Sequence, residues 1–139
     1  MKSTQVIDYA DAKKIVDAIV AKALEQRQSI VVAVTDPHGE LLALARMDGA
    51  PLPSLQIACN KSVTAARGQK PTQEIGDRVR HPEQGFDIAY YGDARFVGWG
   101  GGIPLRKNGE VIGAIGVSGL SSAEDVALAE LGAKLIAET

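Results

Sequence analysis

The chain has 139 residues, 45% of them hydrophobic, and its 15 basic and 17 acidic side chains leave a formal net charge of −2. These values are typical of one globular domain over residues 1–139, and the absence of a basic stripe and of an apolar run near roughly 20 residues argues against nucleic-acid and membrane partners. The single cysteine excludes an internal disulfide and a cysteine-cluster metal site, and the N-terminal stretch lacks an apolar signal segment, so we expect a cytoplasmic protein.

The first half of the chain predicts a helix, a hairpin and a second helix. Asp8–Gln26 is expected to be helical because apolar residues recur every three or four positions. Ile30–Thr35 and Glu40–Arg46 are predicted to be strands, and the Asp-Pro-His-Gly turn between them makes the pair antiparallel. A helix over Leu55–Arg67 follows, with Ser54 expected as its N-cap.

The second half repeats this order with a short helix, a hairpin and a long helix. Pro71–Arg80 is predicted to be helical, and His81–Asp93 is polar and irregular. Ile103–Arg106 and Val111–Ser118 form the second hairpin, because an Asn-Gly pair in the turn favours a tight connection. A Ser-x-x-Glu capping box at Ser121 begins the final helix. Antiparallel pairs of strands with helices between them indicate a layered α+β domain.

A glycine-rich stretch, Gly98–Gly119, holds eight of the 15 glycines. Glycine weakens a strand, so this density requires a backbone bend or something packed close to the backbone. In the last strand Ala114, Gly116 and Ser118 point to one side, which leaves that face nearly bare. We expect this face to admit a closely packed helix.

Three charged residues are candidates for chemistry. Arg46 and Asp48 follow directly after a strand, a common place for a ligand site, although they can also pair with each other and fix the turn. Lys61 lies on a helix face of small residues, where a lysine can be a buried ligand contact or simply solvated.

Histidines and the glycine-rich turn offer further candidates. His81 in the irregular segment can ligate a haem iron, although a lone loop histidine is most often a solvated side chain. Gly98–Gly102 lacks the spacing of a nucleotide fingerprint, but its N–H groups can form an anion-binding nest. Trp99 in this turn can cover an apolar ligand or a subunit contact.

Three blocks together resemble the GlcG/HbpS-like haem-binding family, which includes the C-terminal domain of PduO-type proteins. The blocks are Val34–Ala50, Asn60–Gly68 and GWGGGIPLRKNGEVIGAIGVSG, and Asp125 with its helix closes the match. The resemblance implies a profilin-like fold of α/β/α layers, with a five-stranded antiparallel sheet flanked by helices. It also implies homo-oligomers and, in some members, haem as a cofactor.

Site residues follow from the same resemblance. The family motif falls on Arg46, Asp48 and Lys61, and on Gly100 and Gly101 in the glycine-rich turn. Thr64 is the best match to a helix-two threonine implicated in haem binding in an HbpS-type member.

Two functions of different kinds remain open, with a scaffold role as a third. The first is binding of haem or another tetrapyrrole against Trp99 and the glycine turn, with Arg46 or Lys61 pairing a propionate. The second is a small catabolic enzyme for an anionic hydroxy or keto acid or a ring-cleavage product. In that enzyme Arg46 would hold the carboxylate, and Lys61 or Asp48 would transfer a proton.

Overall fold

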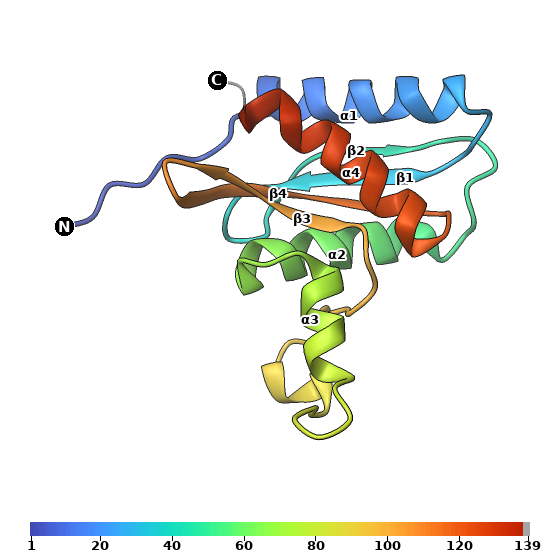
Figure 1. Cartoon of the computed structure of the whole chain (residues 1–139). Coiled ribbons are helices and arrows are strands. Elements are labelled where there is room, and N and C mark those ends of the chain that lie inside the picture. The colour runs from blue at the N-terminus through green and yellow to red at the C-terminus, as the bar shows by residue number, and fades with distance from the viewer. Residues whose placement is uncertain (138–139) are drawn as a thin grey trace.

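The computed structural model describes residues 1–137, and its elements follow the predicted order (Figure 1). In chain order they are α1 (Tyr9–Glu25), β1 (Val31–Thr35), β2 (Leu41–Arg46), α2 (Ser54–Gly68), α3 (Thr72–Val79), the 3-10 helix η1 (Ile88–Tyr91), β3 (Gly102–Lys107), β4 (Glu110–Ser118) and α4 (Ser122–Ala137). Within this part of the chain no helix is both long and apolar enough to cross a membrane.

The strands form one antiparallel sheet in the order β2-β1-β4-β3. The expected five-stranded sheet is therefore wrong for the described residues, which contain a four-stranded sheet. Between α3 and β3, the residues around η1 form backbone hydrogen bonds locally rather than along a strand. The Asp87 carboxylate accepts from the N–H of Ala89, and the N–H of Gly92 bonds back to the carbonyl of Ala89. Turns and a 3-10 helix result.

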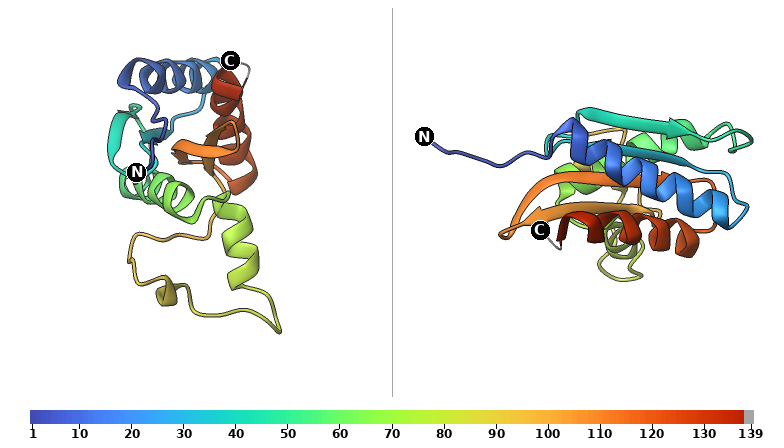
Figure 2. Two further views of the ribbon diagram at one scale, coloured as in Figure 1. Left: turned by 90° about the vertical axis from the view of Figure 1, so that its left-hand side faces the viewer. Right: turned by 90° about the horizontal axis from the view of Figure 1, so that it is seen from above.

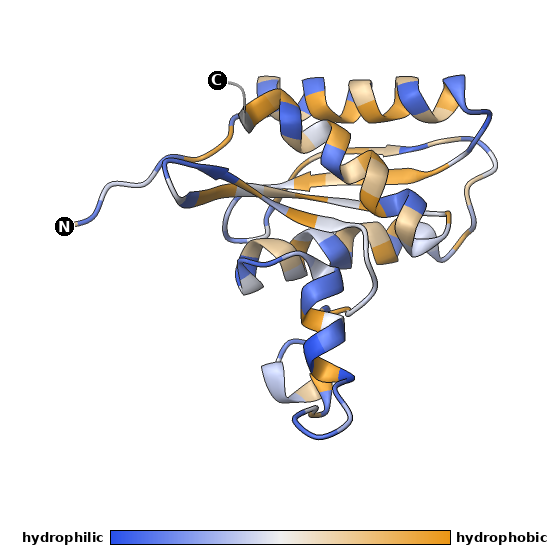
Figure 3. Ribbon diagram, in the orientation of Figure 1, coloured by the Kyte–Doolittle hydropathy of each residue, from blue (hydrophilic) through white to orange (hydrophobic). Residues whose placement is uncertain are grey.

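Helices cover both faces of the sheet (Figures 1 and 2). On one face, α1 and α4 enclose the main core, in which Ile15 and Ile19 of α1 pack with Ile115 of β4. The predicted buried stripe of α1 is confirmed. On the other face, α2 packs against β1, β3 and β4. Figure 3 shows the apolar residues gathered on the strands and on the helix surfaces that meet them.

The bare face of β4 receives α2, as the sequence predicts. A Cβ at Gly116 would collide with the carbonyl oxygen of Ala58 and would lie 2.6 Å from the nitrogen of Ser62. The small residues of the strand therefore let the helix backbone approach directly, which fixes α2 over the end of β4.

The two helix caps expected from the sequence have different outcomes. The Ser121 hydroxyl accepts from the N–H of Glu124 at 3.2 Å, and the Glu124 carboxylate accepts from the N–H of Ser121 at 3.4 Å, which confirms the capping box. Ser54 is wrong as an N-cap: Pro53 occupies that position, and Ser54 is the first residue of α2. Its hydroxyl bonds with the Ser118 hydroxyl instead, because β4 ends directly beneath it.

Candidate functional site

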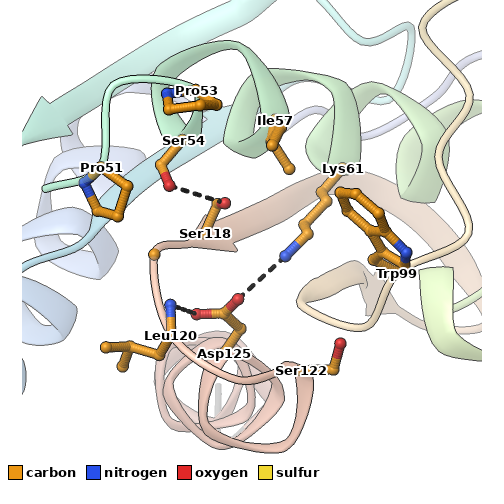
Figure 4. Close-up of a pocket in the computed structure, with 11 residues that line it drawn as sticks. Pro51, Pro53, Ser54, Ile57, Lys61, Trp99, Ser118, Leu120, Ser122 and Asp125 are labelled. Atoms are coloured by element: carbon orange, nitrogen blue, oxygen red, sulfur yellow. Dashed lines mark hydrogen bonds and ion pairs between the residues drawn. The ribbon is translucent and has the colours of Figure 1, made fainter.

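A cavity of about 340 Å³ lies where the start of α2, the end of β4 and the start of α4 meet the segment that carries Trp99 (Figure 4). The residues that line it include Ser54, Ile57, Lys61, Trp99, Ser118 and Asp125. The cavity therefore combines polar side chains with an aromatic ring and aliphatic walls.

Lys61 and Asp125 form a buried ion pair at this cavity. Lys61 Nζ lies 3.1 Å from Asp125 Oδ2, and each side chain is only 3% exposed. Lys61 Nζ also donates to the carbonyl oxygen of Val117 at 2.8 Å. The other carboxylate oxygen, Asp125 Oδ1, accepts from the N–H of Leu120 at 3.2 Å. The pair thus joins α2 to both the end of β4 and the start of α4.

Burial pulls the two pKa values toward each other. It lowers the pKa of the Lys61 ammonium, against the opposing effect of the Asp125 charge. It raises the pKa of the Asp125 carboxyl, against the opposing effect of Lys61. Both shifts have the same cause, which is that a charge is less stable away from water. A perturbed acid and base that face a cavity together are typical of a functional site.

The glycine-rich turn makes room for this pair. Gly101 has φ +130°, and a Cβ built on it would lie 2.9 Å from Lys61 Nζ and 2.5 Å from the carbonyl oxygen of Val117. A Cβ at Gly100 would lie 2.6 Å from Gln73 Oε1. Neither glycine is among the residues that line the cavity. Gly101 thus lies behind the ion pair, whereas Gly100 packs against Gln73, Val126 and Ser122.

Trp99 lies at the mouth of the cavity. Its side chain is 56% exposed, although indole rings are usually buried for the most part. Figure 4 shows the ring beside the Lys61 side chain. Trp99 and Lys61, which lie 38 positions apart in the sequence (99 minus 61), are therefore brought together by the fold.

The structure does not bring Arg46 and Asp48 to this cavity. Arg46 ends the edge strand β2, opposite Val31 of β1, and both charged residues are exposed. Neither lines the cavity that holds Lys61. Within residues 1–137 the two also form no ion pair with each other, so the alternative that they fix the turn finds no support in the hydrogen bonds.

Thr64 and His81 also lie outside the cavity. The buried Thr64 hydroxyl donates to the carbonyl of Asn60 at 2.7 Å and accepts from the N–H of Val97 at 3.0 Å. His81 is exposed, and its Nδ1 accepts from the N–H of Gln84 at 3.0 Å. In the described structure both side chains hold local backbone segments in place.

Sequence reasoning missed Asp125, Ser54 and Ser118 as cavity residues. A signal for Asp125 was present, since it precedes Leu128 and Ala129 by three and four positions and so shares their buried helix face. A carboxylate on an apolar face requires a partner. No local signal identified that partner as Lys61.

The cavity fits the periphery of a haem group better than its iron. The ammonium of Lys61 suits a propionate, and the exposed ring of Trp99 suits a flat macrocycle. The side chains that line the cavity include no His, Cys, Met or Tyr, the usual axial ligands of haem iron. Among the described residues there is also no cluster of three or more His, Cys, Asp or Glu side chains that could hold a metal ion.

Known proteins resemble the chain along nearly its whole length. A family model described as haem-degrading protein HbpS-like matches residues 7–134. An uncharacterized 15.0 kDa protein of Citrobacter freundii, from the dhaT-dhaS intergenic region, is 41% identical over 131 residues, 93% of this chain and 92% of that protein. The crystal structure of Klebsiella pneumoniae protein ORFY matches with a TM-score of 0.91 and 32% identity, covering 100% of this chain and 96% of that one. The crystal structure of a PduOC:heme complex matches with a TM-score of 0.87 and 28% identity, over 94% and 95% of the two chains.

Proposed function

Since the chain belongs to the HbpS-like family, we propose that it binds haem or a related tetrapyrrole in the cavity beside Trp99. The observation that carries this proposal is an exposed indole ring at the mouth of a cavity that contains a buried lysine. A flat anionic ligand is the kind of molecule that such a pair of side chains recognises.

Each residue has a part in this proposal. Trp99 contributes an aromatic face for the macrocycle, and the ammonium of Lys61 pairs with a propionate. A structure of PduOC with haem, 28% identical to this chain, supports haem as the tetrapyrrole. Because the cavity provides none of the usual axial ligands, we expect binding through the ring and its propionates rather than through the iron.

A haemin titration tests this function. We expect a saturable shift of the Soret band with the wild-type protein and at least a tenfold weaker affinity for Trp99→Ala. Trp99→Phe should retain most of the affinity because it keeps an aromatic face. His81→Ala is the matched test of iron ligation and should leave the spectrum unchanged. A haemin spectrum that the protein does not alter, or a shift lost only in His81→Ala, would contradict the proposal.

A second candidate function is an enzyme that acts on an anionic hydroxy or keto acid. The observation that favours it is the lowered pKa of Lys61 next to the raised pKa of Asp125, since such a pair can move a proton between enzyme and substrate. Arg46, exposed on β2, has no part in this version. Its test is deuterium exchange at the carbon next to the keto group of pyruvate in D₂O, followed by proton NMR. Exchange no faster than in buffer would rule out this activity for pyruvate.

We also propose that the chain self-associates through the α2 side of β2. Leu44 and Arg46 pair with Ala33 and Val31, and both of these β1 residues lie on the side of the sheet that α2 covers. Leu44 is nevertheless 40% exposed because β2 is an edge strand, and Leu52 before α2 is 84% exposed. Arg46 and Asp48 are opposite charges without an ion-pair partner in residues 1–137. A two-fold related copy would cover the leucines and pair these charges between protomers.

A further inference from the structure

We infer that the cavity contains a recognition site for a carboxylate group, and that small aromatic carboxylates bind there as ligands in their own right. This inference rests on the proposed function only in its choice of cavity. It concerns the group that anchors a ligand, and it does not require a tetrapyrrole.

Lys61 has a donor to spare. An ammonium carries three N–H donors and no acceptor. Two are used, by the carbonyl oxygen of Val117 and by Asp125 Oδ2. In the part of the chain that the structure describes, the third has no acceptor. Since Lys61 lines the cavity, a ligand there is the available partner.

The pair of serine hydroxyls has a second spare donor. Ser118 donates its hydroxyl hydrogen to the Ser54 oxygen at 3.2 Å, so the hydroxyl hydrogen of Ser54 remains. Ser54 and Ser118 are only 4% and 5% exposed, and both line the cavity. Among the described residues no acceptor takes the remaining hydrogen. A buried hydroxyl without an acceptor favours a ligand that brings one.

The start of α2 contributes further N–H donors that have no acceptor. This 15-residue helix has no acidic residue in its first turn and no side-chain cap. Within the described chain, the N–H groups of Leu55 and Gln56 bond to no backbone carbonyl or side chain. The positive end of the helix dipole thus lies beside the Ser54 hydroxyl, where it favours negative charge.

Asp125 is the one carboxylate among the residues that line the cavity, and each of its oxygens already accepts a hydrogen bond, one from Lys61 and the other from the N–H of Leu120. The unpaired donors beside it favour an anion. Ile57, Pro51 and Trp99 provide apolar walls around them, which suit a flat hydrocarbon body. An aromatic carboxylate combines both properties.

The fluorescence of Trp99 provides the test, because it is the one tryptophan of the chain. Benzoate and its neutral isostere benzamide are titrated into the protein with excitation at 295 nm. We expect saturable quenching by benzoate and an affinity for benzamide at least tenfold weaker. Ser54→Ala should weaken benzoate by about tenfold, since it removes the hydroxyl that donates to the charged group. Ser3→Ala, an exposed serine in the N-terminal segment, is the matched control and should change nothing.

The outcomes separate this inference from haem binding. Equal affinity for benzoate and benzamide would overturn it, as would quenching by inorganic phosphate with no response to benzoate. Should Ser54→Ala fail to fold, saturation-transfer NMR on Ser118→Ala, which removes the partner of the Ser54 hydroxyl, measures the loss of benzoate binding. Benzoate binding without a Soret shift would support the carboxylate site and contradict the haem proposal. A Soret shift without benzoate binding would support haem binding and contradict the carboxylate site.

Discussion

Gly101 lies against the ammonium of Lys61: a Cβ on the glycine would be 2.9 Å from Nζ and 2.5 Å from the carbonyl oxygen that Nζ bonds to. We therefore predict that Gly101→Ala destabilises the fold by about 2–4 kcal/mol, because it combines a strained backbone with overpacking. Chemical denaturation measures this change in the free energy of unfolding.

Gly92→Ala is the matched control for this prediction. Gly92 also has a positive φ, +73°, but a Cβ there would meet nothing within 4 Å. Gly92→Ala should therefore lower the free energy of unfolding by only about 1–2 kcal/mol, which is the cost of the strained backbone without overpacking. Equal losses for the two variants would mean that the contact with Lys61 contributes nothing to the requirement for glycine at position 101.

Lys61→Met tests the ion pair. It leaves the Asp125 carboxylate buried without its partner, and we expect a loss of about 3–5 kcal/mol in the free energy of unfolding. The double variant Lys61→Met/Asp125→Leu removes both charges, and its stability should return to within about 1 kcal/mol of wild type or exceed it. Thermal and urea unfolding of both variants measure this recovery.

The double variant also separates stability from function. If the pair serves only to hold α2 and α4 together, the stable double variant will bind haemin and benzoate like wild type. We predict instead that both affinities fall by at least tenfold, since the spare N–H donor is lost. Normal binding by the folded double variant would contradict the place given to Lys61 in both proposals.

The elements of this fold were predictable because their signals are local. The Asn108-Gly109 turn, with φ +52° and +80°, and the Ser121 capping box lie within four residues of chain. The expectation of a fifth strand rests on the family resemblance alone, and the residues that the structure describes contain four strands.

The site was predictable only in part. Lys61 was a candidate because small residues surround it on its helix face, and Trp99 because it interrupts a glycine-rich turn. The pairing of Lys61 with Asp125 depends on a contact across 64 residues of chain, which no local pattern specifies. The sequence makes Arg46 a candidate because it follows a strand, but that strand lies at the sheet edge and Arg46 does not line the cavity.

A substitution at Thr64 distinguishes packing from ligand binding. Thr64→Val keeps the shape of the side chain but leaves the N–H of Val97 without its acceptor, so we expect a loss of about 1–3 kcal/mol in stability. Thr64→Ser keeps the hydroxyl and should lose less. Because Thr64 does not line the cavity, the affinity of Thr64→Val for haemin should equal that of wild type. A lower affinity for haemin in the Soret titration, with unchanged stability, would indicate that Thr64 belongs to the ligand site.

Low pH should reduce the stability that Asp93 provides in the segment that leads to Trp99. Hydrogen bonds from Arg95 are the main cause that lowers the pKa of Asp93 below 3.8, and Arg67 adds to it. A carboxyl whose pKa is lower in the folded state stabilises the fold above its unfolded value, and this contribution disappears as the pH falls through the folded pKa. We therefore predict that wild type is more stable than Asp93→Asn at pH 6 and that the difference shrinks below pH 3.8. Thermal melting of both proteins from pH 6 to pH 2 measures it, and a difference that is independent of pH would contradict the assignment.

Self-association through β2 predicts a charge-swap result. Arg46→Asp places two acidic side chains opposite each other in a two-fold pair and should shift the protein toward the monomer, with a dissociation constant at least tenfold higher. Arg46→Asp combined with Asp48→Arg restores the opposite charges and should recover the oligomer. Light scattering after size-exclusion chromatography measures the mass of each variant. A mass that Arg46→Asp and Leu44→Lys both leave unchanged would exclude this surface as the interface, because Leu44 is the apolar residue of β2 beside Arg46 on the same face.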